Sequence, residues 1–332
     1  MVNVTNPSLN KTDGCSSGSS IVDTQSTPLY LQFGGCLSRS TLPRNRPWMP
    51  SIHEKELSKL HPVWHVVGLG RDFFWKTNTK DNEDVEDDKV NKKLELEGAV
   101  QALVETIASH PQQIVGLFAD LDYCTPEIHR NKPEREWCEA QLERLRATLF
   151  AAVHPSNTRV MTVQIRLLPC DNSDSNKTSE AYSHVVLDLA TILSAYLPHN
   201  KDLKVHLSCW AGSPLHMNEL VQKFPNQVYI GMDATVTFSK ANEMHECAFE
   251  LHPNRLLLET GRPGTIPSIL TRTMGRDAYG HPAWSIPWIA ESMASHSSPM
   301  HGNDGEPLNA TSIARAASAN TTLLYPGVLA VK

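Results

Sequence analysis

The segment LSCWAGSPLHMNELVQKFPNQVYIGMDATVTFSKANEMHECAFELHPNRLLLETGRPG, residues 207–264, decides the fold. Within and beside it, three short apolar runs are predicted strands separated by stretches of helical periodicity: LKVHLSCW (203–210), VYIGMDA (228–234) and RLLLET (255–260). Strands that alternate with helices are typical of a parallel sheet. Several runs are apolar at successive positions, which is expected when helices cover one face of the sheet and a packed barrel interior covers the other.

The same alternation continues towards the N-terminus. Five further strands are predicted there: SIVDT (20–24), LYLQFGG (29–35), VWHVVGL (63–69), IVGLFADLD (114–122) and RVMTVQIRL (159–167). The total of about eight strands predicts an α/β fold of the (β/α)8 TIM-barrel type. Almost nothing separates the first two runs, so either the barrel is irregular around its first βα unit or the first predicted strand is wrong.

Two amphipathic helices are predicted at 133–153 and 180–197. In the first, Pro133 suits a helix start, and Trp137, Leu142, Leu145 and Leu149 form one apolar stripe.

The chain of 332 residues is expected to form one folded domain with a polar extension. Residues 1–19 are rich in Ser, Asn and Gly and are predicted to be disordered, and residues 20–332 are predicted to form the single barrel domain. Polar insertions at 80–93 and 170–180 are predicted to be solvated loops at the carboxyl ends of the strands. An acidic metal or partner site is the alternative interpretation of the first insertion.

Composition limits the class of protein. The net charge of -6 gives no basic surface of the kind that supplies most non-specific nucleic-acid affinity. The seven cysteines are scattered and odd in number, with no C-x-x-C pair, which favours reduced thiols in an intracellular compartment. Neither a secretory signal nor an apolar run of about 20 residues is present. The expected location is the cytoplasm or the nucleus, without membrane attachment.

The segment 207–264 resembles the TatD family of metal-dependent hydrolases, which typically reads HCFSGS, YIGISGVVTFKNA and RLLLETDSPY at the corresponding places. HPQQIVGLFADLDYC (110–124) is similar to the family's VVGEIGLDY strand, and LNATSIARAASANTTLLYPGV (308–328) is similar to its closing helix. SIVDTQS (20–26) resembles its opening IDTHCH. The resemblance implies an amidohydrolase-like barrel, whose active members hold two divalent metal ions at the carboxyl ends of the strands and remove nucleotides from DNA ends.

The resemblance also implies which residues stand at the family's six metal-ligand positions. They are Gln25 and Thr27 for the H-x-H pair, Leu117 or Phe118 for the glutamate, Gln164 and Ser208 for two histidines, and Gly261 for the aspartate. Imidazoles and carboxylates are what a catalytic divalent ion needs, and none stands at these positions. The chain therefore resembles a divergent member that lacks the metal ligands, and no metal cofactor is expected.

A relocated site is the alternative. Its candidate residues are His206, Asp233, Asp122 and Cys209. His206 shares a strand face with Ser208 by the period of two, although a barrel-lining histidine satisfied by a hydrogen bond is the simpler interpretation.

The predicted function is a non-catalytic interaction or assembly module that binds protein partners through the loops at the carboxyl ends of the strands. The alternative is a divergent DNase or phosphodiester hydrolase with a relocated metal site. Nucleic-acid binding without cleavage is disfavoured by the acidic net charge.

Overall fold

The structure is a computed structural model of the chain. It describes residues 2–4, 31–33, 36–42, 63–69, 85–123, 134–168, 175–261, 265–267, 269, 270, 272, 285–301 and 307–326.

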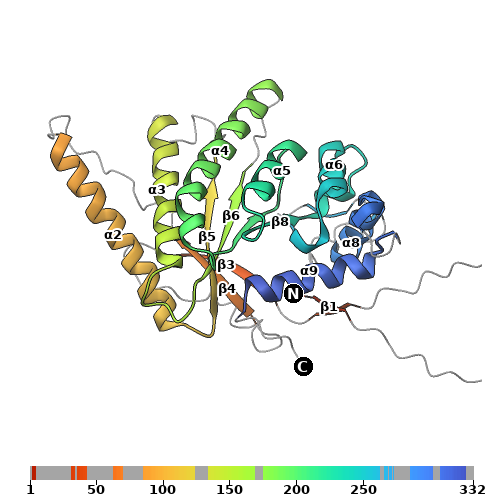
Figure 1. Cartoon of the computed structure of the whole chain (residues 1–332), viewed down its shortest axis with the longest axis horizontal. Helices are drawn as coiled ribbons and strands as arrows, with labels where there is room; N and C mark the ends of the chain where they lie inside the picture. The colour runs from red at the N-terminus through yellow and green to blue at the C-terminus, as the bar shows by residue number, and fades with distance from the viewer. Residues whose placement is uncertain are drawn as a thin grey trace, which may run out of the picture.

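The centre of the molecule is a seven-stranded parallel sheet with the order β3-β4-β5-β6-β7-β8-β9 (Figure 1). Its strands are β3 (Cys36–Leu42), β4 (Val63–Leu69), β5 (Ile114–Leu121), β6 (Thr162–Leu167), β7 (Val205–Ser208), β8 (Val228–Met232) and β9 (Leu256–Leu258). The helices are α2 (Val85–Ser109), α3 (Glu134–Ala152), α4 (Ser175–Tyr196), α5 (Pro214–Lys223), α6 (Asn242–Glu250), α8 (Ser285–His296) and α9 (Ala310–Leu324).

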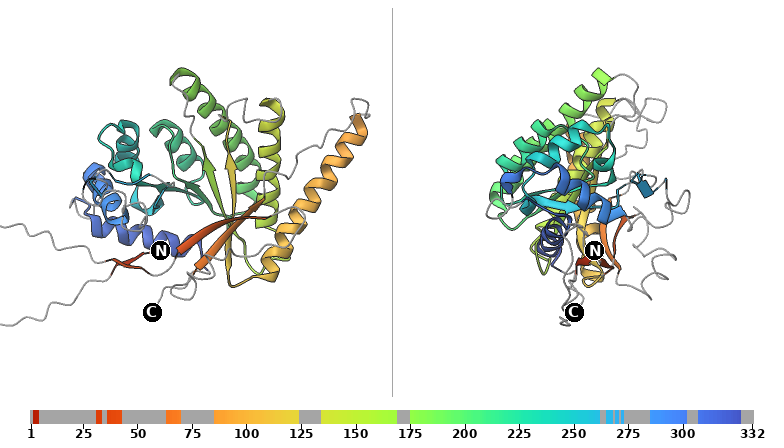
Figure 2. Two further views of the ribbon diagram at one scale, coloured as in Figure 1. Left: turned by 180° about the vertical axis from the view of Figure 1, so that it is seen from behind. Right: turned by 90° about the vertical axis from the view of Figure 1, so that its right-hand side faces the viewer.

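Strand order follows chain order, and a helix follows nearly every strand. That is the arrangement of a TIM-type barrel, so the predicted α/β class is confirmed. Within the described residues the strand ladder runs from β3 to β9, and no pairing joins those two strands to each other. The helices α3, α4 and α5 lie along one face of the sheet in the views of Figures 1 and 2.

Apolar residues of the strands enter two separate clusters. The larger cluster lies between the sheet and the helices and includes Leu117, Ile165 and Leu207. The smaller one lies on the other, inner face of the sheet and includes Val66, Val115, Phe118, Tyr229, Leu257, Leu324 and Tyr325. The sequence left open whether Leu117 or Phe118 stands at the family's glutamate position. Phe118 faces the inside of the sheet and Leu117 faces the helices, so Phe118 is the residue on the inner face.

The end of α9 closes the inner cluster at the amino ends of the strands. Asn309 begins the helix with a capping box in which its side chain accepts from Ser312 N–H. At the other end the Thr162 hydroxyl donates to the Leu324 carbonyl, and Tyr325 is only 1% exposed. The C-terminal segment is therefore part of the barrel interior.

The N-terminal third differs from the prediction. The run 29–35 contributes only β2 (Leu31–Phe33), which pairs antiparallel with β1 (Val2–Val4) in a separate two-stranded sheet. β1 thus lies inside the stretch predicted to be disordered, and its register pairs Val2 with Phe33. The strand that joins the main sheet is β3, which the sequence analysis missed because CLSRSTL has no apolar run. The predicted strand 20–24 lies outside the described residues.

Both polar insertions are partly helical, which corrects the loop prediction. Residues 85–93 form the start of α2, and 175–180 form the start of α4. Both stretches join directly onto amphipathic helices, and extending an existing helix adds one hydrogen bond per residue without a new nucleation step.

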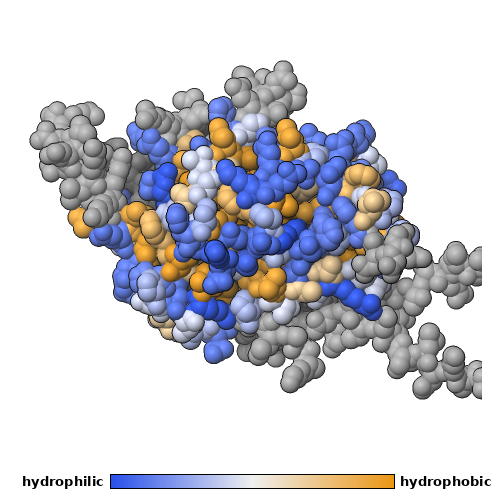
Figure 3. Space-filling view, in the orientation of Figure 1, coloured by the Kyte–Doolittle hydropathy of each residue, from blue (hydrophilic) through white to orange (hydrophobic). Residues whose placement is uncertain are grey.

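No helix in the described ranges combines the length and apolar character needed to cross a membrane. On the face seen in Figure 3, apolar side chains lie in several patches separated by polar ones.

The buried thiol of Cys247 on α6 is expected to make the stability of the protein depend on pH. Burial raises the pKa of Cys247 to about 12 from an ordinary 9.0, while the nearby Trp210 side chain opposes this. Above pH 9 the unfolded chain loses the thiol proton, whereas the folded chain keeps it. The free energy of unfolding therefore falls as the pH rises from 9 towards 12, by at most about 1.4 kcal/mol per pH unit. Urea midpoints of the wild type and Cys247→Ala, compared between pH 8 and 10.5, are expected to converge as pH rises. Parallel pH profiles would contradict this expectation.

Candidate functional site

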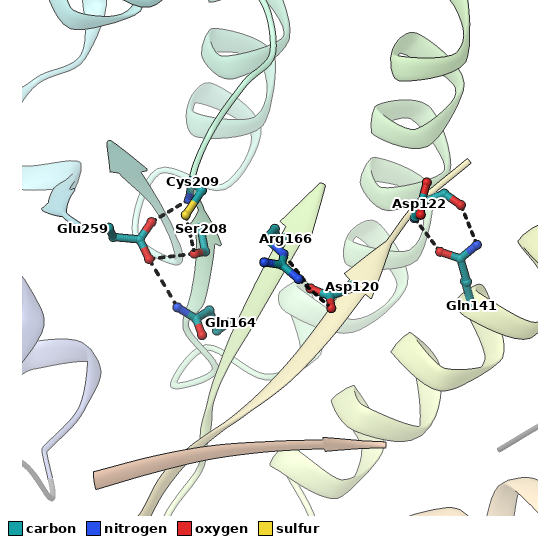
Figure 4. A network of polar contacts seen from close by, with 8 residues as sticks. All are labelled: Asp120, Asp122, Gln141, Gln164, Arg166, Ser208, Cys209 and Glu259. Carbon is teal, nitrogen blue, oxygen red and sulfur yellow. Dashed lines mark hydrogen bonds and ion pairs between the residues drawn. The ribbon is translucent and has the colours of Figure 1, made fainter. Parts of the chain in front are cut away.

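Side chains from the carboxyl ends of β6, β7 and β9 meet on the inner face of the sheet. Gln164 comes from β6, Ser208 ends β7, and Glu259 directly follows β9 (Figure 4). The parallel register places Gln164 beside His206 on the neighbouring strand. Because the carboxyl ends of parallel strands share one edge of the sheet, residues far apart in sequence converge here.

Glu259 is the centre of this polar cluster. Its Oε1 accepts from the Ser208 hydroxyl at 2.6 Å and from the Gln164 amide nitrogen at 3.4 Å. Its Oε2 accepts from the backbone N–H of Cys209 at 2.5 Å. The side chain is 15% exposed, so the carboxylate is largely removed from water and its charge is stabilised by protein donors. Cys209 itself has φ 50°, in the left-handed region, directly after the end of β7.

His206 lies under the carboxylate and links it to the C-terminal segment. Its Nδ1 is 2.8 Å from the Tyr325 hydroxyl, and its Nε2 is 3.5 Å from Glu259 Oε1. The Gln164 amide nitrogen, which can only donate, lies 3.4 Å from the same Nδ1. These contacts favour the tautomer with the proton on Nε2, facing Glu259. The simpler interpretation of His206, a barrel-lining histidine held by hydrogen bonds, matches this geometry.

Asp233 and Gly261 lie against each other at the ends of β8 and β9. Asp233 begins the 3-10 helix η3 (Ala234–Thr237), and its Oδ1 accepts from Thr235 N–H at 2.9 Å. A Cβ on Gly261 would lie 2.9 Å from Asp233 Oδ2, and Gly261 has φ +79°. The space beside position 261 is therefore taken by the Asp233 carboxylate.

The end of β5 carries two further polar groups that point elsewhere. Asp120 forms a bidentate pair with Arg166 of β6, with both contacts at 3.0 Å. The backbone of Asp122 is held by α3, since its carbonyl accepts from the Trp137 indole at 2.6 Å and from the Gln141 amide at 2.8 Å. Figure 4 shows the Glu259 cluster, the Asp120–Arg166 pair and the Asp122–Gln141 pair as three separate groups.

The structure brings together four of the residues singled out from the sequence: Gln164, Ser208, His206 and Cys209 surround Glu259. Phe118 lies on the same inner face, whereas Gln25 and Thr27 lie outside the described residues. Asp122 does not join the group.

Two contributors to the cluster, Glu259 and Tyr325, were missed by the sequence analysis, as was the separate Asp120–Arg166 pair. An acidic residue directly after an apolar strand was a signal for Glu259. The opposite charges of Asp120 and Arg166 at the ends of predicted neighbouring strands were a signal for their pair.

Among the described residues, no three His, Cys, Asp or Glu side chains lie close enough together to hold one ion. His206 Nε2 lies 3.5 Å from Glu259 Oε1, and that oxygen already accepts from Ser208 and Gln164.

Comparison with known proteins finds three similarities. Residues 177–325, which contain β7, β8, β9 and α9, match the family model described as TatD related DNase. The human (Homo sapiens) 3'-5' RNA nuclease TATDN2 is 29% identical over 104 residues, which span 31% of this chain and 13% of that relative. The crystal structure of an uncharacterized amidohydrolase from Saccharomyces cerevisiae has a TM-score of 0.48 and 14% identity, with 88% of each chain covered. Residues 177–325 are therefore similar to the TatD-related DNase family.

Proposed function

We propose that this TatD-type barrel has lost the metal-dependent hydrolysis of its family and acts as a non-catalytic interaction or assembly module. The observation that carries the proposal is the chemistry of the inner face at the carboxyl ends of the strands. Phe118 presents an aromatic ring and Gly261 has no side chain, so neither offers a lone pair to a cation.

The remaining described positions support the same proposal. Gln164 and Ser208 are neutral, and both hydrogen-bond to Glu259. A divalent ion held there would have to displace these bonds and then compete with water for weak ligands. The donors from Ser208, Cys209 and Gln164 supply the charge stabilisation that a buried Glu259 carboxylate needs without an ion.

Protein partners are the proposed ligands. The carboxyl-end face of a TIM-type barrel is its usual binding surface, and the net charge of -6 disfavours a nucleic-acid backbone there. We propose an intracellular location, cytoplasmic or nuclear, because the scattered cysteines suit a reducing compartment.

Nuclease assays test the loss of catalysis. Purified full chain is incubated with 3'-labelled single-stranded DNA and RNA in Mg²⁺, Mn²⁺ or Zn²⁺, beside an active TatD nuclease as positive control. We expect no cleavage that EDTA abolishes, and about background levels of bound metal by mass spectrometry. Metal-dependent cleavage by the wild type, together with bound metal ions in stoichiometric amounts, would overturn the proposal.

A divergent hydrolase with a relocated site is the second candidate. Asp233 favours it, because its carboxylate occupies the space beside position 261, where the resemblance places the family's aspartate. This candidate predicts that cleavage by the wild type is lost in Asp233→Asn and in His206→Asn. Glu219→Gln is the matched control, since Glu219 lies on α5, outside the Glu259 cluster.

A further inference from the structure

Two histidine pairs connect the same two segments of the chain. His245 of α6 stacks on His296 of α8, and His252 lies beside His301. His252 caps the 3-10 helix η4 (Pro253–Arg255) just before β9, and His301 ends the 3-10 helix η7 (Pro299–His301) just after α8. His252 and His301 therefore lie towards the amino end of β9, whereas Glu259 follows the carboxyl end of that strand.

The two pairs differ in ring geometry. The rings of His245 and His296 are 3.9 Å apart with 12° between their planes. Each already donates to a carbonyl: His245 Nε2 to Val236 at 3.0 Å, and His296 Nδ1 to Ser292 at 2.8 Å. Imidazole lone pairs lie in the ring plane, so stacked parallel rings cannot direct two nitrogens at one ion.

The rings of His252 and His301 are not parallel, so one nitrogen of each ring can be directed at the same ion. The ring centroids are 5.2 Å apart and the planes are tilted by 56°. Nδ1 of His301 is buried and has no hydrogen-bond partner within the part of the chain that the structure describes. Around a tetrahedral ion with bonds of about 2.05 Å, two nitrogen ligands lie about 3.3 Å apart, which is less than the distance between the two ring centroids.

We propose that His252 and His301 form a binding site for a divalent transition-metal ion, with water completing the coordination. Imidazole ligands select Cu²⁺, Ni²⁺ or Zn²⁺ over Mg²⁺ and Ca²⁺. The bound ion links η4 to η7 beside the hydrogen bond from Ser298 N–H to the Phe249 carbonyl. The site is separate from the inner-face cluster and does not depend on the proposed loss of catalysis.

Binding requires one adjustment at His252. Its Nδ1 now accepts from Asn254 N–H at 3.2 Å, which places the ring proton on Nε2. Coordination through Nε2 moves that proton to Nδ1 through solvent and removes this hydrogen bond. A bond of that length at an exposed position contributes little, so the adjustment does not prevent binding.

Calorimetric titration of the untagged full chain with Zn²⁺ or Ni²⁺, at about pH 7.5, tests the proposal. His301→Ala is expected to weaken one site by about tenfold or more. His252→Asn is expected to weaken the same site, and it keeps an N-cap oxygen close to the place of Nδ1, so η4 stays capped. His296→Ala, in the stacked pair, is the matched control and is expected to leave that site unchanged.

The results that overturn the proposal are specific. Equal stoichiometry and affinity in the wild type, His301→Ala and His252→Asn would overturn it. A loss of the same site in His296→Ala would also overturn it, because binding would then reflect the packing of α8 rather than the tilted pair. Should His301→Ala fail to fold by circular dichroism, His301→Gln and His252→Asn decide the result.

Discussion

Replacing Gly231 by Ala is expected to destabilise the protein by about 2–4 kcal/mol. Gly231 lies on β8, between the strands that carry His206 and Glu259. A Cβ there would lie 2.0 Å from Glu259 Oε2 and 2.7 Å from His206 Nε2. The carboxylate would have to leave the donors that stabilise its charge, and a buried anion without donors is costly. Urea denaturation followed by circular dichroism measures the change.

Gly98→Ala is the matched control for that substitution. Gly98 lies in α2, and an added Cβ there meets no atom within 4 Å. Since alanine is the better helix former, this variant is expected to gain about 0.5–1 kcal/mol. Equal stability of the two variants would mean that Glu259 and His206 do not meet above Gly231, and the description of the polar cluster would be wrong.

The strands of the barrel could be predicted wherever an apolar run coincided with the sheet. β4 matches the predicted limits of 63–69, and β5, β6, β7, β8 and β9 all lie within predicted runs. β3 could not be found in this way, because the segment CLSRSTL contains no apolar run. Its place in the sheet is seen only from its pairing with β4, where seven residues of each strand are in register. The run LYLQFGG misled the prediction, since hydrophobicity alone does not say which sheet a strand joins.

The candidate site was predictable only in part, for a related reason. The flanking motifs fixed the positions of Ser208 and Gly261 in the sequence comparison, and in the structure Ser208 ends β7 and Gly261 follows β9 by three residues. The choice between Leu117 and Phe118 depended on an irregularity in the β4–β5 pairing at His65/Val66, which no local pattern reveals. The convergence of Gln164, Ser208 and Cys209 on Glu259 depends on the relative register of β6, β7 and β9, which is a tertiary property.

The inner face has a consistent physical character. Its apolar part is filled by Val66, Phe118 and Tyr325. Its polar part, near the carboxyl ends, is satisfied by hydrogen bonds from the protein itself. His206 joins the two parts, because it contacts Tyr325 through one ring nitrogen and lies near Glu259 with the other. The interior is thus completed by the C-terminal residues of the domain, so its stability is expected to depend on them.

Tyr325→Ala is accordingly expected to cost about 3–5 kcal/mol, the range for removing a large buried aromatic side chain. The ring packs against Gly116, where an added Cβ would lie 3.0 Å from Tyr325 Cε1, and the side chain is 1% exposed. Tyr325→Phe keeps the ring and removes only the 2.8 Å hydrogen bond to His206 Nδ1, so a loss of about 1 kcal/mol in the free energy of unfolding is expected.

Leu323→Ala, at a neighbouring position that is 57% exposed, is the control and should change stability by less than about 0.5 kcal/mol. Urea midpoints in the order Leu323→Ala, Tyr325→Phe, Tyr325→Ala, from most to least stable, would agree with a C-terminal residue that fills the barrel interior. Equal midpoints for the three variants would mean that Tyr325 does not pack there, because only a buried ring makes its removal so much more costly than the loss of its hydroxyl.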